Sequence, residues 1–354
     1  MSSSIQSTST ALVVYDPTLP HISLKFHLET LVDGVYKRSF EVAKKESSLL
    51  SQSYWKERVV AGVASGVRHL YIDKEVGEKM ARLILHNFSK GTYDGYASLY
   101  EFKDAILKDL RSVYPDKHLD LLCTEEAIPR CDPDRSLHTL RPEEYTEEQT
   151  QYLASLKNTD QPDLSHAVRA SIIPGTNIGY FQINEFFSPD FPEAMKDIDE
   201  GMKSVVDAEA LIIDLRNNTG GNPATVAYLA SYLFDSRQLW NQIYQRSTDE
   251  TTSFYVEPEK LEHVFGGKKL VYVLTSSRTF SAAEELAYGL QSCGRAKIVG
   301  QTTKGGAHTV RPYVVDDHTY IIVPYTTSIN PHTSKNWEGT GVMPDIPIST
   351  EYMR

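Results

Sequence analysis

Two turns that follow apolar runs carry residues able to do chemistry. The run ALIIDL at 210–215 leads into an Asn- and Gly-rich turn that ends with Gly220 and Gly221, and KLVYVLTS at 269–276 leads into a loop that ends at Ser281. Simple strand-to-helix turns, with glycines for packing and a serine as helix cap, would explain both. Ligands bind at the carboxyl ends of strands in open α/β sheets, so we expect both turns at one edge. There a Ser281 nucleophile would share the helix N-terminus and the glycine turn with the oxyanion that its attack creates.

A serine nucleophile needs a base, and the base needs a group that orients it. His118, in the segment Asp-Lys-His after the helical region, is the best placed of the eleven histidines. Glu338, in a Gly-rich segment near the carboxyl terminus, could bring a carboxylate beside that imidazole. Taken alone, each is more simply a polar surface residue. Together with Ser281 they could fill the three roles of nucleophile, base and orienting acid.

The elements that must position these residues follow two patterns. From about 54 to 114, apolar residues recur at helical spacing, which predicts three amphipathic helices. From 178 onward, apolar strands alternate with helices, which predicts an α/β fold with a mainly parallel sheet. The last quarter alternates in hydropathy around an Asp-Asp turn, which predicts antiparallel C-terminal strands.

These patterns divide the chain into four parts. We expect an N-terminal extension at 1–50, a helical domain at 51–124, a linker or flap at 125–177 and an α/β domain of catalytic type at 178–354. The linker is rich in Pro, Asp, Glu and Thr and shows little periodicity.

Composition excludes several classes of partner. Lys and Arg number 36 against 47 Asp and Glu, a net charge of −11, so we expect no nucleic acid and no anionic membrane as partner. No stretch approaches the roughly 20 apolar residues that span a bilayer, and the first ten residues do not resemble a secretory signal. The cysteines, Cys123, Cys131 and Cys293, lack metal or redox spacing and fit a reducing compartment. We expect a cytoplasmic protein without a metal or cofactor, and the sequence indicates no oligomeric state.

Four ordered motifs resemble the tail-specific, or carboxy-terminal processing, proteases. They are IGYFQINEF, LIIDLRNNTGG, the serine segment SRTFSAAEELAYGLQSCGRAKIVGQTT and the ending EGTGVMPDI. Upstream, LYIDKEVGEKMARLI and DKHLDL resemble the helical region of the subgroup that includes interphotoreceptor retinoid-binding protein. The resemblance implies a ClpP/crotonase-like fold. We expect the PDZ insertion usual in the processing proteases to be absent, since the linker at 125–177 has neither the length nor the strand pattern of such a domain.

The resemblance also implies roles for single residues. Ser281 stands at the position of the nucleophile, and the backbone N–H groups of Ala282 and of Gly220 or Gly221 stand where the oxyanion hole is built. The lysine base of the dyad branch would fall at Gly306, so that base is missing, and Lys304 lies two residues away.

The tricorn-like branch instead uses a histidine and a glutamate, and His118 and Glu338 match those positions. Lys117 stands where tricorn-like enzymes have a serine that supports the base.

Two functions are consistent with these residues. The first is a serine peptidase in which Ser281 attacks a peptide carbonyl. The second is the same fold used to bind, or to carry out non-hydrolytic chemistry on, an apolar small molecule, since a fold does not determine a function. The expected partner is therefore a peptide or small-molecule substrate.

Overall fold

The first part of the protein is helical. The computed structural model describes residues 26–27, 39–40, 47–123, 167–316 and 318–348. The short strands β1 (Phe26–His27) and β2 (Ser39–Phe40) pair with each other and precede three helices, α1 (Ser47–Leu70), α2 (Lys74–Ser89) and α3 (Leu99–Val113). Asp73 caps the N-terminus of α2. Its Oδ1 accepts the N–H of Val76 at 2.9 Å and so satisfies one of the free donors of the first turn. These helices confirm the three that the apolar spacing predicts.

A six-stranded sheet forms the second part of the described chain, in the order β13, β10, β9, β6, β5 and β4. All neighbours are parallel except β4 and β5. The strands are β4 (Val168–Ile172), β5 (Ile178–Ile183), β6 (Ala210–Asp214), β9 (Leu270–Thr275), β10 (Lys297–Gly300) and β13 (Ile346–Pro347). The helices in this part are α5 (Pro192–Val205), α6 (Pro223–Ser231) and α7 (Ala282–Ser292). Because β6 and β9 are parallel neighbours, the turns that follow them lie at the same edge.

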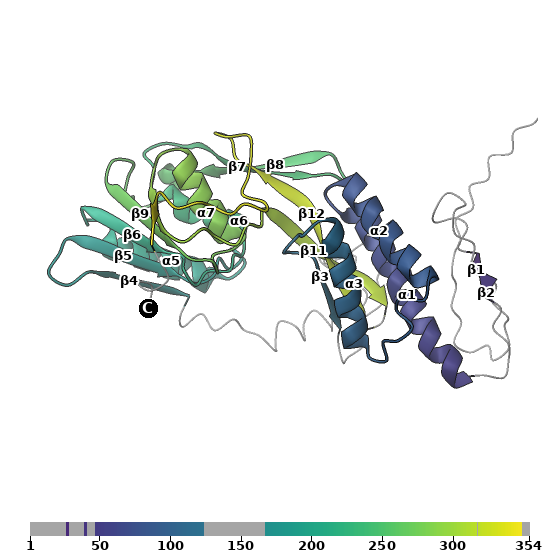
Figure 1. Ribbon diagram of the computed structural model, residues 1–354. Coiled ribbons are helices and arrows are strands. Elements are labelled where there is room, and N and C mark those ends of the chain that lie inside the picture. Colours follow the sequence, from purple (N-terminus) through teal and green to yellow (C-terminus); the bar gives the residue numbers. More distant parts are fainter. Residues whose placement is uncertain (1–25, 28–38, 41–46, 124–166, 317, 349–354) are drawn as a thin grey trace, which may run out of the picture.

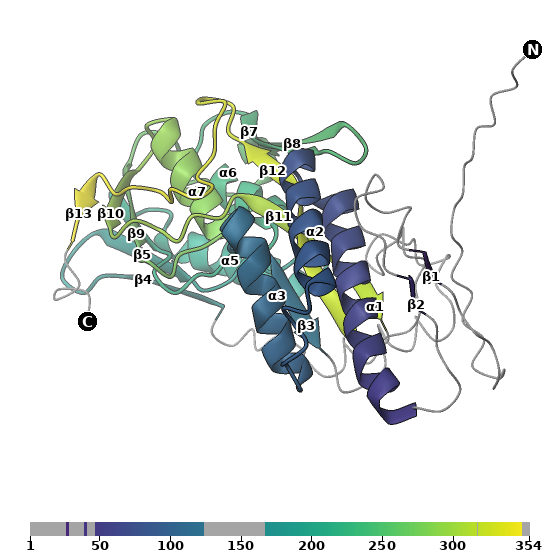
Figure 2. The same ribbon diagram turned by 45° about the vertical axis from the view of Figure 1, so that its right-hand side comes forward.

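A long antiparallel hairpin connects the two parts (Figure 1). The hairpin consists of β11 (His308–Asp316) and β12 (Thr319–Ile329). Both strands belong to a second sheet that also contains β3 (Asp120–Cys123), β7 (Gln238–Gln245) and β8 (Glu250–Val256). The start of β12 pairs with β3, directly after the helices, and its end pairs with β7. Figure 2 shows α1 and α2 lying along this hairpin. β12 therefore joins the strand that follows the helices to β7.

Two hydrophobic clusters stabilise these parts. One is formed by the parallel sheet with α5, α6 and α7, and the other by α1, α2, α3 and residues of β3, β11 and β12. Gly66 in α1 allows close packing on the hairpin, because a Cβ there would lie 2.9 Å from the ring of Tyr313. The helices are thus docked on the C-terminal hairpin by tight apolar contact.

The expected α/β class is confirmed, with some additions. The sequence pattern missed the β7–β8 hairpin, and β4 lies within the range expected to be a linker. Residues 125–166 of that linker, and most of the extension at 1–50, lie outside the described residues, and the domain boundaries stay a prediction.

Within the described ranges, no helix combines the length and apolarity needed to cross a membrane.

Candidate active site

Ser281 occupies a strained turn between β9 and α7. Its φ is +56°, a conformation that residues other than glycine rarely adopt and that costs of the order of 1–3 kcal/mol. Its backbone N–H donates to Oε2 of Glu284 at 2.9 Å. The same buried carboxylate accepts N–H groups of Gly305 at 2.6 Å and Gly306 at 2.9 Å, and a hydrogen bond from Thr303. Glu284 therefore ties the serine turn to the loop 303–306.

The glycine turn lies directly against Ser281, as expected from the strand order. A Cβ on Gly220 would lie 2.8 Å from Cβ of Ser281. The N–H of Gly220 already donates to Oδ1 of Asn218 at 2.8 Å, whereas those of Gly221 and Ala282 have no acceptor among the described residues. Of the predicted oxyanion donors, Gly221 and Ala282 are therefore the pair whose N–H groups are available.

His118 packs against Phe280, the residue that precedes Ser281. Its ring stacks on that of Phe280 with centroids 4.3 Å apart, and its Nδ1 is buried without a hydrogen-bond partner in the described structure. Burial lowers the pKa of His118 to about 4, against the opposing charge of Asp116. The imidazole is therefore neutral, and able to accept a proton, at neutral pH.

Gly306, at the position of the dyad lysine, has no room for a side chain. A Cβ there would lie 2.6 Å from Cε1 of His118 and would overlap the ring of Phe280. Lys304 places its Nζ 4.3 Å from the centroid of Phe280. The space that a side chain at 306 would need is thus filled by His118 and Phe280.

Glu338 does not contact His118 as predicted. Its Oε2 accepts the N–H of Ala307 at 2.6 Å and lies 3.6 Å from Nδ1 of His308, and no hydrogen bond joins it to His118 in the part of the chain described. The carboxylate beside His118 is Asp116, whose Oδ1 accepts the backbone N–H of His118 at 2.9 Å and lies 4.0 Å from Nδ1 of the His118 ring.

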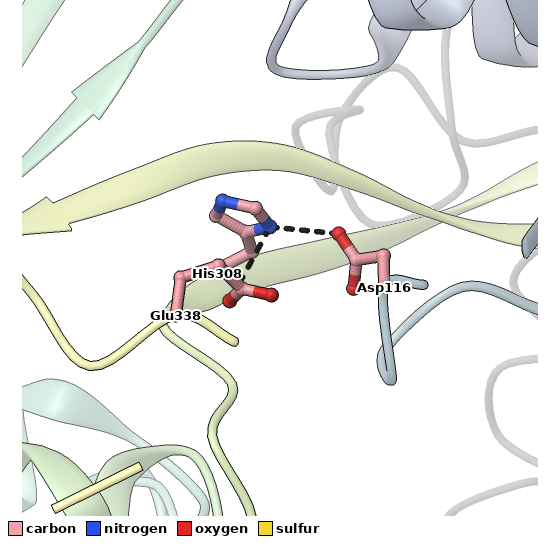
Figure 3. Close-up of side chains that lie close together, drawn as sticks. All are labelled: Asp116, His308 and Glu338. Carbon is pink, nitrogen blue, oxygen red and sulfur yellow. Dashed lines mark hydrogen bonds and ion pairs between the residues drawn. The ribbon is translucent and has the colours of Figure 1, made fainter. Parts of the chain in front are cut away.

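Asp116 and His308 form a buried pair that the sequence analysis missed (Figure 3). Nδ1 of His308 lies 2.8 Å from Oδ2 of Asp116, which also accepts the Tyr71 hydroxyl at 3.0 Å. Asp116 is fully buried, and the side chain of His308 is 9% exposed. Burial alone would raise the pKa of Asp116, but its hydrogen bonds, chiefly that with His308, hold it below the usual value. The spacing Asp-x-His at 116–118 is the one available signal for Asp116; nothing local signals His308.

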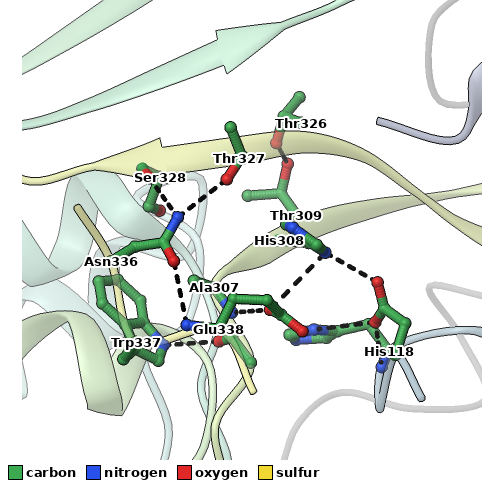
Figure 4. A network of polar contacts seen from close by, with 12 residues as sticks. His118, Ala307, His308, Thr309, Thr326, Thr327, Ser328, Asn336, Trp337 and Glu338 are labelled. Carbon is green, nitrogen blue, oxygen red and sulfur yellow. Dashed lines mark hydrogen bonds and ion pairs between the residues drawn. The ribbon is translucent and has the colours of Figure 1, made fainter. Parts of the chain in front are cut away.

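The loop that carries Glu338 is fixed on β12 (Figure 4). The side-chain amide of Asn336 donates to the carbonyl of Ser328 at 2.7 Å, and its oxygen accepts the N–H of Glu338 at 3.0 Å. Trp337 Nε1 donates to the carbonyl of Gly306 at 2.6 Å. The acid is thus held by several groups rather than placed on a free loop.

These groups meet at a small pocket. Ser281, Ala282, Gly221, Gly306 and His308 all line it. Ser281, the residues of both available N–H groups and His308 therefore face one space, whereas His118 and Glu338 are not among the residues that line it. A second pocket of about 360 Å³ adjoins it at His308 and has tyrosines among its walls.

One group among the described residues could hold a metal ion. The ligand atoms of Asp116, His308 and Glu338 lie within 4.8 Å of one another. The hydrogen bond between His308 and Asp116 already engages two of these atoms, so the cluster is accounted for as a hydrogen-bonded ion pair with a second acid nearby.

Comparison with known proteins finds peptidases and processing proteases. Residues 177–348 match Peptidase family S41. The carboxy-terminal processing protease CtpB of Bacillus subtilis is 26% identical over 180 residues, which are 50% of this chain and 35% of that protein. The carboxyl-terminal-processing protease of Picosynechococcus is 28% identical over 50% of this chain and 40% of that protein. The chain thus spans well under half the length of these relatives.

Solved structures share the fold. A putative peptidase from Parabacteroides merdae superimposes with a TM-score of 0.55 at 17% identity, over 84% of this chain and 91% of that one. Mature CPAF complexed with lactacystin gives 0.54 at 12% identity, over 82% and 94%. Tricorn protease gives 0.50 at 12% identity, over 88% of this chain and 36% of that one. The matched family model and the processing-protease relatives agree: residues 177–348 match peptidase family S41 and are similar to the carboxy-terminal processing, or tail-specific, proteases.

Proposed function

We propose that this protein is a serine peptidase of the tail-specific type, with a ClpP/crotonase-like fold, that cleaves peptides by acyl transfer. Ser281 attacks the carbonyl carbon, and the N–H groups of Ala282 and Gly221 stabilise the oxyanion. The observation that carries the proposal is the strained Ser281 turn, which shares one pocket with both available donors. Strain at a serine between strand and helix is typical of nucleophiles that must be exposed to substrate.

His118 is the proposed base. Residue 306 is a glycine, and His118 and Phe280 fill the space that the side chain of a lysine base would need at this position. Glu338, predicted to orient His118, acts in this proposal through the loop it anchors at Ala307 and through its charge beside His308. Asp116 takes over the direct contact with the His118 segment.

The alternative function is binding of an apolar small molecule. The observation in its favour is the second pocket, whose walls include Tyr71, Tyr114, Tyr244, Ile72 and Val76. A pocket of this size beside a nucleophile suits a substrate side chain equally well.

The cytoplasmic location expected from the sequence stays a prediction.

Labelling with a fluorophosphonate probe separates the two functions. A peptidase should be labelled, and the label should disappear in Ser281→Ala. Absence of labelling in the wild type, together with tight binding of an apolar fluorescent ligand, would favour the alternative.

A further inference from the structure

Two histidines share one carboxylate at this site: His308 lines the pocket of Ser281, and His118 lies beside Gly306 in the pocket wall. Oδ1 of Asp116 faces His118, and Oδ2 is hydrogen-bonded to His308. Both rings are nearly buried, with side-chain exposures of 10% for His118 and 9% for His308. The catalytic scheme proposed above uses only one of them, His118.

The two rings differ in what they can do. Nδ1 of His308 is paired with Asp116 and lies 3.6 Å from Glu338, so two acids stabilise its charged form. Its second nitrogen points away from both acids in Figure 3 and has no partner among the described residues. His308 also lines the pocket of Ser281. Its second nitrogen is therefore free to donate an N–H to a bound group.

From this geometry we infer that His308 is a second catalytic residue, a general acid that protonates the leaving amine while His118 accepts the proton of Ser281. The inference rests on the proposed peptidase function. It divides between two rings the two proton transfers that a single histidine performs in a Ser-His-Asp triad.

The protons balance over one cycle. In acylation, the Ser281 hydroxyl proton moves to His118, the bond from carbonyl carbon to nitrogen breaks, and His308 gives its proton to the departing amine. In deacylation, water attacks the acyl-enzyme and its proton passes to the now neutral His308. His118 returns its proton to the Ser281 oxygen as that oxygen leaves, so both histidines regain their starting states.

The charges around His308 favour this role. Burial alone lowers the pKa of His308, but the hydrogen bond to Asp116 and the charge of Glu338 raise it above its ordinary value overall. Tyr71 and Tyr114 also face the two acids, and burial raises the pKa of both hydroxyls, so they stay neutral.

Two lysines and the other histidine complete the surroundings. The charge of Lys117 acts on Glu338, and that of Lys304 acts on His118. The charge of His308 itself helps to lower the pKa of His118. The pKa values of the two histidines are thus shifted in opposite directions, as general acid–base catalysis requires of an acid and a base.

The test compares an amide with an activated ester of the same acyl group. A p-nitrophenolate leaving group needs no protonation, whereas an amine does. We expect His308→Gln to lower kcat/KM for a peptide amide by about 10²–10⁴-fold and to change ester turnover by much less, while His118→Ala impairs both. His263→Gln, at an exposed site, is the matched control.

The wild-type pH profile supplies a readout that needs no variant. Amide turnover should fall on the alkaline side as His308 loses its proton, and ester turnover should not. Equal losses on amide and ester in His308→Gln, no loss on either, or identical alkaline limbs for both substrates would overturn the inference. So would Ser281-dependent ester turnover without any amide turnover. Absence of Ser281-dependent ester turnover would instead overturn the proposed function itself.

Discussion

The serine turn and the histidine loop are held in place in different ways. Ser281 is fixed by its own sheet edge and by Glu284, three residues further along the chain. His118 depends on groups distant in sequence, because Asp116 beside it is bonded by Tyr71 and His308. The first region is organised locally and the second by packing between the helices and the C-terminal hairpin. Changes in the helical part should therefore disturb the base without disturbing the nucleophile.

The largest effect should come from removing the nucleophile. Ser281→Ala should lower kcat by about 10⁶-fold, because the acyl-enzyme cannot form. Its unfolding free energy should stay within about 1 kcal/mol of the wild type, since alanine keeps the same strained backbone. Ser281→Gly should be equally inactive but at least as stable, because glycine adopts φ of +56° freely. Kinetics and thermal denaturation of both variants test this, and a Ser281→Gly variant less stable than Ser281→Ala would contradict the strained turn.

Loss of the base should come next. His118→Ala should lower kcat/KM by about 10²–10⁴-fold, because no other neutral imidazole is proposed to accept the Ser281 proton. Lys304→Ala is the matched control and should remain close to wild-type activity. An inactive Lys304→Ala beside an active His118→Ala would mean that a lysine base operates after all.

The serine turn can also be loosened without touching Ser281. In Glu284→Gln an amide nitrogen replaces one of the oxygens that accept from Ser281, Gly305 and Gly306, so at least one buried donor loses its partner. Such a loss costs about 1–3 kcal/mol. We expect lower stability and a fall in kcat with little change in KM. Wild-type stability in this variant would show that Glu284 does not hold the turn.

The smallest effect should come from the histidine loop. Tyr71→Phe removes the hydroxyl that donates to Asp116 at 3.0 Å, while His308 and the His118 N–H still donate to it. We expect a loss of about 1 kcal/mol in unfolding free energy and slower turnover at unchanged KM. Chemical denaturation and steady-state kinetics check this, and a kcat as low as that of His118→Ala would mean that Tyr71 takes part in the chemistry.

The same difference explains what could be predicted from the sequence. The helices, the strands that lead to Gly220 and Ser281, and the contact between those two turns follow from local periodicity and from strand order. The β7–β8 hairpin was missed, although its polar and apolar residues alternate in places. The pairing of Asp116 with His308 could not be predicted, because it joins residues 192 positions apart in the sequence. For the same reason the contacts of Glu338 with Ala307 and His308, in place of the expected contact with His118, could not be predicted, since a loop acid carries no local sign of the imidazole it faces.

The most direct test of the central claim, a Ser281 nucleophile served by a neutral buried histidine, is the rate of fluorophosphonate labelling of Ser281 as a function of pH. Fluoride leaves without protonation, so this rate isolates the base from any general acid. The rate rises as the base loses its proton, and burial lowers the pKa of His118 to about 4. We therefore predict a half-maximal rate well below pH 6.5, with the adduct located on Ser281 by peptide mass spectrometry. A half-maximum above about pH 8, as expected for a lysine base, or an adduct on any other residue would contradict the account.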